Sequence, residues 1–141
     1  PDRRKAAASD ALCSTVDLAS TILERAGVEP FNGNQGLSFL PATKGEAGPR
    51  SEALIEYNDG GSRLGFESPA RVRSLVTDRW RYSVYHEQPW GELYDLKNDP
   101  NETHNLWDDA DHKDIRAYMS ERLTHHLIAQ MDESPMSDRL A

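Results

Sequence analysis

The 141-residue sequence has little of several features that would place it in a broad functional class. No apolar run approaches the ~18 residues of a membrane-spanning helix, so we expect a soluble protein without a membrane partner. The single cysteine, Cys13, cannot form an internal disulfide, and cysteine usage therefore leaves the compartment open. Acidic residues outnumber basic ones by 24 to 16, and the resulting net charge of −8 disfavours binding to nucleic acid.

The common signatures of a catalytic centre are also missing. The sequence has no Gly-rich phosphate loop, no Cys-x-x-Cys pair and no evident Ser/His/Asp set. His125 and His126 are adjacent on an expected helix and would point about 100° apart, so solvated or capping histidines are favoured over metal ligands. Cys13 has no histidine nearby in sequence, and we expect it to be a small buried hydrophobic residue. We therefore predict no catalytic residue and no metal ligand within this chain.

The first third of the chain predicts one helix and a long loop. Apolar residues recur every three to four positions over residues 12–27, with the start at residue 12 or 15 left open. Ser14 and Asp17 form an acidic capping pattern, and Gly27 is placed to end the helix in a left-handed conformation. Residues 28–50 are rich in Gly and Pro and contain the best candidate for a domain boundary. We divide the chain into residues 1–45 and 46–141, the latter with a polar tail at 132–141.

The remainder predicts a small antiparallel sheet covered by one helix. Residues 51–57 and 91–96 have strand patterns, and residues 71–85 form a hairpin that turns near Asp78 and Arg79. Leu106 and Trp107 would pin the returning chain to the sheet edge. Residues 112–131 predict an amphipathic helix with Asp111 as its N-cap. Its apolar positions are Ile115, Met119, Leu123, Leu127 and Met131, with Tyr118 beside them. A helix laid on three or four antiparallel strands makes the fold class α+β.

Candidate binding residues lie where strands end. The loop of residues 58–71 and His86 both leave strand ends with little apolar content, which is typical of segments that contact ligands. Guanidinium groups bind sulfate and phosphate oxyanions well. We select Asn58, Arg63, Arg71 and His86 as candidate substrate-binding residues. The triplet Asn58-Asp59-Gly60 resembles a fragment of a calcium loop, but it lacks the alternating ligands and the distal Glu, so a turn is favoured.

Four stretches resemble the C-terminal part of bacterial sulfatases, members of the alkaline phosphatase superfamily. TVDLASTILERAGV (residues 15–28) is similar to the family's VDLxPTxLxxAG helix, with Ser20 in place of the usual Pro. NQGLSFLP (residues 34–41) is similar to its QGxSLLP loop, with Phe39 in place of Leu. VRSLVTDRWRYSVY (residues 72–85) resembles its hairpin. GELYDLKNDPNETHNL (residues 91–106) resembles the ELYDLxxDPxExxNL signature, which is the most specific of the four.

The resemblance implies that the chain is the C-terminal segment of a sulfuric-ester hydrolase. It would contain the last helix of the catalytic domain and then an α+β subdomain with a structural and cleft-lining role. Family members use a Cys or Ser in C/S-x-P-x-R, converted to formylglycine, together with a calcium ion. Both are expected in the parent enzyme and not in this segment, because Cys13 is followed by Ser-Thr-Val-Asp. In the family, the metal-binding pair comes before the VDLxPTxLxxAG helix in the sequence. The triplet Asn58-Asp59-Gly60 comes after the matching helix of this chain, so it does not correspond to that pair.

The resemblance also implies partners. These are the parent catalytic domain and a sulfate-ester substrate, in a bacterial cytoplasm or periplasm. Without the catalytic domain, the helix Leu12–Ala26 would expose an apolar stripe and self-associate. Two alternatives stay open: a phosphate- or phosphonate-ester hydrolase of the same superfamily, and a stand-alone interaction module without catalytic activity.

Overall fold

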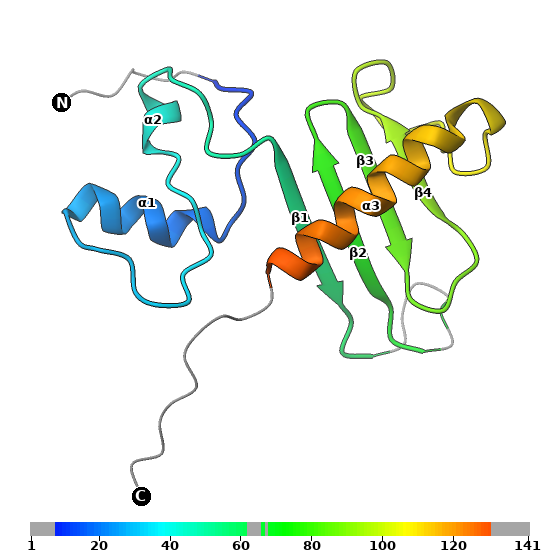
Figure 1. Cartoon of the computed structure of the whole chain (residues 1–141), viewed down its shortest axis with the longest axis horizontal. Coiled ribbons are helices and arrows are strands. Elements are labelled where there is room, and N and C mark those ends of the chain that lie inside the picture. Colours follow the sequence, from blue (N-terminus) through cyan, green and yellow to red (C-terminus); the bar gives the residue numbers. More distant parts are fainter. Residues whose placement is uncertain (1–7, 62–65, 67, 131–141) are drawn as a thin grey trace, which may run out of the picture. The chain divides into compact units, whose positions relative to one another are not determined.

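The computed structural model describes residues 8–61, 66 and 68–130. The chain divides into two compact units, one formed by Ser51–Ile128 and the other by the segments that flank it. Figure 1 shows the order of the elements. No helix of the described residues combines the length and the apolar character that crossing a membrane requires.

The flanking unit contains helix α1, Asp17–Ala26, and the short helix α2, Leu40–Thr43, which lies inside the segment predicted as a loop. Gly27 ends α1 with φ 68°, as predicted. The helix begins later than residue 12 because the Asp17 carboxylate accepts hydrogen bonds from the N–H groups of Ser14 and Leu37. Asp17 is fully buried and forms an ion pair with Arg50, so its side chain ties the start of α1 to the loop.

The apolar stripe of α1 is exposed. Val16, Leu18 and Ile22 are more than half exposed, whereas Asp17 and Ser20 are the buried residues of the helix segment. Cys13 is exposed, so the prediction of a buried cysteine was wrong. It precedes the first helical turn and therefore has no place on the helix face.

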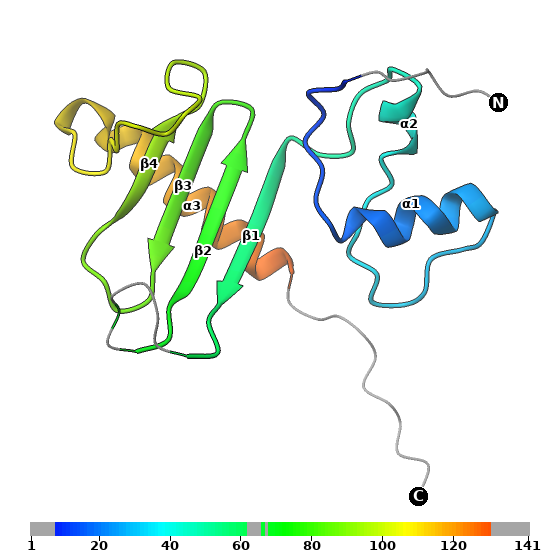
Figure 2. The ribbon, with the colours of Figure 1, turned by 180° about the vertical axis from the view of Figure 1, so that it is seen from behind.

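The central unit is built on a four-stranded antiparallel sheet with the strand order β1-β2-β3-β4. The strands are β1 (Glu52–Asn58), β2 (Arg71–Thr77), β3 (Trp80–Tyr85) and β4 (Gly91–Asp95). Across the sheet Leu75 pairs with Leu54 and with Tyr82, and Tyr82 pairs with Leu93, which sets one apolar row on one face. Figure 2 shows the sheet from its other face, with α3 behind it. The predicted α+β class, strands and hairpin are confirmed.

The turn η1, Ala110–His112, and the helix α3, Lys113–Ala129, follow the sheet, and α3 crosses one face of it (Figure 1). The side chain of Asp109 accepts from the Asp111 N–H, so the N-cap lies two residues before the predicted one, ahead of a 3-10 turn. Tyr118 and Leu127 are exposed at 53% and 38%, so the buried face of α3 is narrower and shorter than predicted, with Met119 and Leu123 as its buried residues. Met131 lies outside the described residues. The buried core consists of Leu75, Tyr82, Leu93, Leu106, Met119 and Leu123.

The segment after β4 closes that edge of the sheet. The Leu106 N–H donates to the Leu93 carbonyl, and the Asn105 side chain bonds both the Leu93 N–H and the Gly91 carbonyl. Trp107 stacks on Tyr82 with ring centroids 5.6 Å apart. A Cβ on Gly91 would lie 2.4 Å from the Trp107 ring, so only glycine fits beneath it. The predicted role of Leu106 and Trp107 is confirmed.

Candidate functional site

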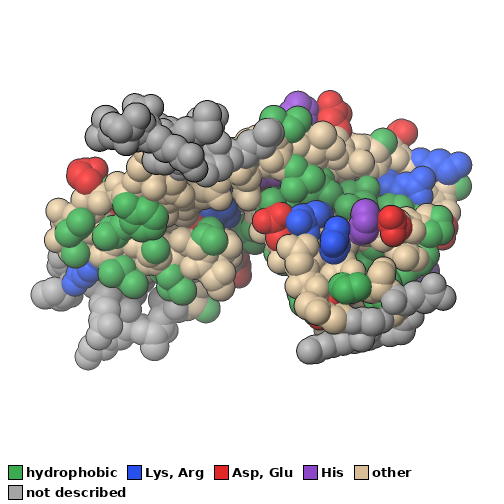
Figure 3. Space-filling view, turned by 90° about the horizontal axis from the view of Figure 1, so that it is seen from below, with side chains coloured by type: hydrophobic (Ala, Val, Ile, Leu, Met, Phe, Trp, Pro, Cys, Tyr) green, Lys and Arg blue, Asp and Glu red, His purple; other side chains and the backbone are tan. Residues whose placement is uncertain are grey.

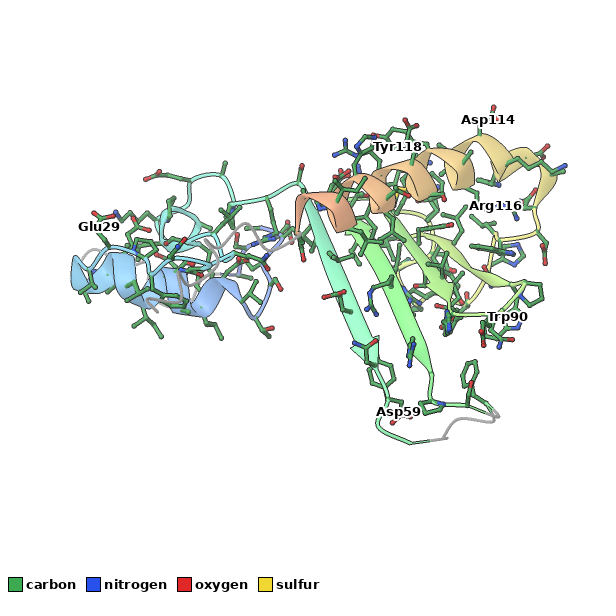
Figure 4. The ribbon with its side chains drawn as sticks, turned by 60° about the horizontal axis from the view of Figure 1, so that its bottom comes forward. Glu29, Asp59, Trp90, Asp114, Arg116 and Tyr118 are labelled. Carbon is green, nitrogen blue, oxygen red and sulfur yellow. The ribbon has the colours of Figure 1, made fainter. Side chains whose placement is uncertain are left out.

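Three of the four candidate binding residues lie at one end of the sheet. Asn58, the last residue of β1, pairs with Arg71, the first residue of β2. The His86 N–H, just beyond β3, donates to the Arg71 carbonyl at 2.9 Å. Figure 4 shows Asp59, the residue after β1, at this end of the sheet, away from α3. Arg63 lies outside the described residues.

A hollow of about 290 Å³ occupies this end of the sheet, lined by Arg71, Arg73, Val84, Tyr85 and His86. Alternate residues of a strand point to the same face, so Arg71 and Arg73 share the face of Leu75, which α3 covers further along the sheet. Figure 3 views the molecule from below and shows basic and histidine side chains next to one another on the central unit, with acidic side chains beside them. The hollow therefore has a basic wall.

The two arginines of this wall have different surroundings. Arg73 is held inside the unit: its Nη1 donates to the Asn58 Oδ1 at 3.0 Å, and its Nε lies 2.7 Å from the Glu56 Oε1. Arg71 is exposed, and among the described residues no hydrogen bond or ion pair reaches its guanidinium group. A guanidinium group without such partners can bind an oxyanion, whereas that of Arg73 is already engaged by Asn58 and Glu56.

Three aromatic rings gather at this end of the sheet, around Tyr85, which pairs with Val72 and so lies on the face opposite Arg71 and Arg73. The ring centroids of Tyr85 and Trp90 are 4.6 Å apart, and Phe66 lies 6.0 Å from each of them. Trp90 is 42% exposed. Burial raises the pKa of Tyr85 to about 12, and the nearby Glu92 carboxylate acts in the same direction, so its hydroxyl stays protonated near neutral pH.

The sequence prediction left out Arg73 and Tyr85, which line the hollow, and Trp90, which contacts Tyr85. The spacing of two residues between Arg71 and Arg73 is a signal for a shared strand face. The aromatic pair had no such signal, because the contact between Tyr85 and Trp90 depends on how β3 and β4 pair.

The histidines of α3 do not form a site of their own. His125 is exposed, but His126 is not the solvated residue that was expected: its Nε2 lies 2.7 Å from the Glu52 Oε2. Arg122 also donates a hydrogen bond to Glu52. Arg122 is the main cause that lowers the pKa of the Glu52 carboxyl below its usual value; burial opposes this shift, and His126 adds to it. This cluster fastens the last turns of α3 to β1. His112 contacts the capping carboxylate of Asp109 at 3.1 Å.

The described residues show neither a cluster of metal-ligating side chains nor the sulfatase nucleophile motif. No three of their His, Cys, Asp and Glu side chains are grouped to hold a metal ion. Cys13 stands in the sequence Cys-Ser-Thr, which lacks the Pro and Arg of the sulfatase motif.

Comparisons with known proteins give one consistent result. The family model described as N-sulphoglucosamine sulphohydrolase, C-terminal, matches residues 1–129. A Delta 4,5-hexuronate-2-O-sulfatase of Bacteroides thetaiotaomicron is 28% identical over 119 residues, which are 84% of this chain and 24% of that protein. The structure of BT1596, a 2-O GAG sulfatase, is similar with a TM-score of 0.77 and 26% identity, over 92% of this chain and 28% of that one.

A phosphonate monoester hydrolase is also similar. The enzyme SpPMH from Silicibacter pomeroyi gives a TM-score of 0.72 at 27% identity, over 87% of this chain and 26% of its own. The chain thus spans about a quarter of the length of the proteins that it matches.

Proposed function

Because the chain belongs to the N-sulphoglucosamine sulphohydrolase C-terminal family, we propose that it serves as the C-terminal domain of a longer sulfatase that hydrolyses a sulfate ester to an alcohol and inorganic sulfate. The match of the family model over residues 1–129 carries this proposal. The described residues supply no nucleophile motif and no metal site, so the chemical step belongs to the parent's catalytic domain. The calcium ion and the formylglycine that the resemblance implies would lie there too.

In this proposal, the domain contributes to substrate binding through the end of its sheet. Arg71 provides a guanidinium for an anionic group of the substrate, Arg73 and Asn58 hold the wall behind it, and His86 closes its side. The support comes from the exposed guanidinium of Arg71, which has no partner among the residues that the structure describes, beside a hollow of about 290 Å³. Asn58, Arg71 and His86 were selected from the sequence for this role, and Arg63 stays a candidate from the sequence alone.

A first experiment tests whether the chain is part of a longer protein. An antibody raised against this chain is used on an immunoblot of source cells, and a band several times heavier than 15.9 kDa is expected. A band at 15.9 kDa would reject the enzyme proposal and favour the stand-alone module. The heavier protein is then assayed with an aryl sulfate and with an aryl phosphonate monoester, since the likeness to SpPMH makes phosphonate the second candidate.

The binding role has its own test in the parent enzyme. Arg71→Ala should lower the enzyme's kcat/KM for its sulfated substrate by about tenfold or more. The reason is that the substitution removes one charge-assisted hydrogen bond, which contributes ~1.5–3 kcal/mol. Lys97→Ala is the matched control, because Lys97 is a half-exposed cation that contacts Asp78 at the other end of the hairpin. An unchanged kcat/KM in Arg71→Ala would reject the role of the hollow without touching the sulfatase assignment.

A further inference from the structure

The hollow at the end of the sheet has one positive charge that the described residues leave unbalanced. Its lining contains two guanidinium groups, those of Arg71 and Arg73. The Arg73 Nε lies 2.7 Å from the Glu56 Oε1, so these two charges cancel within the central unit. The Arg71 guanidinium has no hydrogen bond or ion pair with a residue that the structure describes, and its charge is therefore the one left over.

The titratable groups that contact the other lining residues change this charge little. Glu92 accepts hydrogen bonds from Arg81, at 3.1 Å, and from the Tyr85 hydroxyl, and the pKa of Tyr85 is raised to about 12, so that hydroxyl stays neutral. The His86 Nε2 lies 3.6 Å from the Glu87 Oε1, so a proton on His86 would be offset by Glu87. The hollow therefore matches a ligand group with a single negative charge.

The size of the hollow limits what it can hold. Its volume of about 290 Å³ lies at the lower end of the ~300–1,000 Å³ that is typical of small-molecule sites. Val84 is the aliphatic residue of the lining and is partly buried against the core. The hydrogen bond of 2.9 Å from the His86 N–H to the Arg71 carbonyl fixes these two residues side by side. Such a hollow has room for one anionic group and the carbon atoms that carry it, and not for a large substrate.

The bond that is cleaved in the proposed function lies elsewhere. Among the described residues, no His, Cys, Asp and Glu side chains are grouped to hold a metal ion, and Cys13 lacks the Pro and Arg of the nucleophile motif. The reacting sulfate ester has to meet a nucleophile, so it is bound by the catalytic domain of the parent. An anion at Arg71 is then a different group of the substrate.

We propose that the hollow binds a second, unreacting anionic group of the substrate, a carboxylate or a further sulfate ester, through the guanidinium of Arg71. This assignment rests on the proposed function and adds to it that the substrate carries at least two anionic groups. A carboxylate and a sulfate ester each carry one negative charge and accept two parallel hydrogen bonds from a guanidinium. A phosphate monoester carries a charge of about −1.5 to −2 at pH 7, more than the hollow balances.

Binding is tested first on this chain, without any reaction. The probes are benzoate and methyl sulfate, with benzamide as the neutral control, and NMR follows the Arg71 Nε–H and the His86 main-chain amide. At least one anion should shift both signals to saturation with a Kd about tenfold or more below that of benzamide. The tighter anion identifies the group that the hollow prefers.

Two variants decide whether Arg71 is responsible. Arg71→Ala should abolish the saturable shift of the His86 amide, whereas Lys97→Ala, which removes a half-exposed cation at the other end of the hairpin, should retain it. Equal affinity for benzamide and the anions, or an anion response that survives in Arg71→Ala, would overturn the proposal.

The parent enzyme tests whether the bound group belongs to the substrate. The measured quantity is kcat/KM for aryl sulfates that carry a carboxylate, divided by kcat/KM for the carboxamides of the same compounds. This ratio should be about ten or more in wild type and in Lys97→Ala, and should fall to near one in Arg71→Ala. A ratio that Arg71→Ala leaves unchanged would overturn the proposal, as would a ratio near one in wild type. A parent that cleaves no sulfate ester would reject the proposed function itself, on which the binding measurement does not depend.

Discussion

Replacing Asp95 by Asn should make the stability of the chain less dependent on pH. Asp95 ends β4 and is 6% exposed. Its carboxylate accepts from the Arg79 guanidinium at 2.8 Å and from the Asn98 side chain at 2.9 Å. The hydrogen bond from Arg79 is the main cause that lowers the pKa of Asp95 from 3.8 to about 2. The hydrogen bonds from Asn98 also lower this pKa, whereas burial opposes the shift.

The magnitude follows from linkage between protonation and folding. A fall in pKa from 3.8 to about 2 corresponds to roughly 2.4 kcal/mol of stability. Arg79 is 46% exposed, and solvent screens its charge, so we expect about 1–2 kcal/mol. Because the folded-state pKa is lowered, this stabilisation is present above pH 3.8 and is lost as the pH falls towards 2.

Urea unfolding of wild type and Asp95→Asn at several pH values between 7 and 2 measures the effect. The difference in free energy of unfolding should be about 1–2 kcal/mol at pH 7 and should shrink towards pH 2. Asp78→Asn is the control, because Asp78 is an 80% exposed carboxylate in the same hairpin turn, and we expect less than ~0.5 kcal/mol from it. A difference that is the same at pH 7 and pH 2 would refute the electrostatic explanation and assign the loss to hydrogen bonding or packing.

Two further substitutions test the fold. Met119→Ala removes a fully buried side chain between α3 and the sheet and should cost about 2–5 kcal/mol in urea unfolding, whereas Tyr118→Ala, at an exposed neighbouring position, should cost far less. Asn105→Ala leaves the Leu93 N–H without its acceptor and should cost about 1–3 kcal/mol, with faster hydrogen exchange at Leu93; an unchanged exchange rate would show that Asn105 does not close the edge.

The amino-acid sequence alone determined the elements of the sheet and its helix. The short apolar run of residues 51–57 and the β-rich arms of residues 71–85 predicted strands, and the four-residue recurrence of Ile115, Met119 and Leu123 predicted a helix with one apolar face; each is a local property of its segment. Gly27 likewise ended α1 as predicted, because few other residues adopt its backbone conformation without strain. The motif in residues 91–106 identified the family before any contact was known.

Tertiary structure decided which residues meet. Asn58, Arg71 and His86 could each be selected from the sequence, but only the register of three strands places them at one end of the sheet. The contact between Tyr85 and Trp90 joins β3 to the segment before β4, and no local pattern encodes it.

The errors have the same origin. Cys13 was expected inside and is exposed, and His126 was expected in solvent and contacts Glu52, 74 positions away. Periodicity reports whether a segment has an apolar side. Which polar group a side chain contacts depends on residues that are distant in the sequence, as Glu52 is from His126. Only the folded structure reveals such contacts.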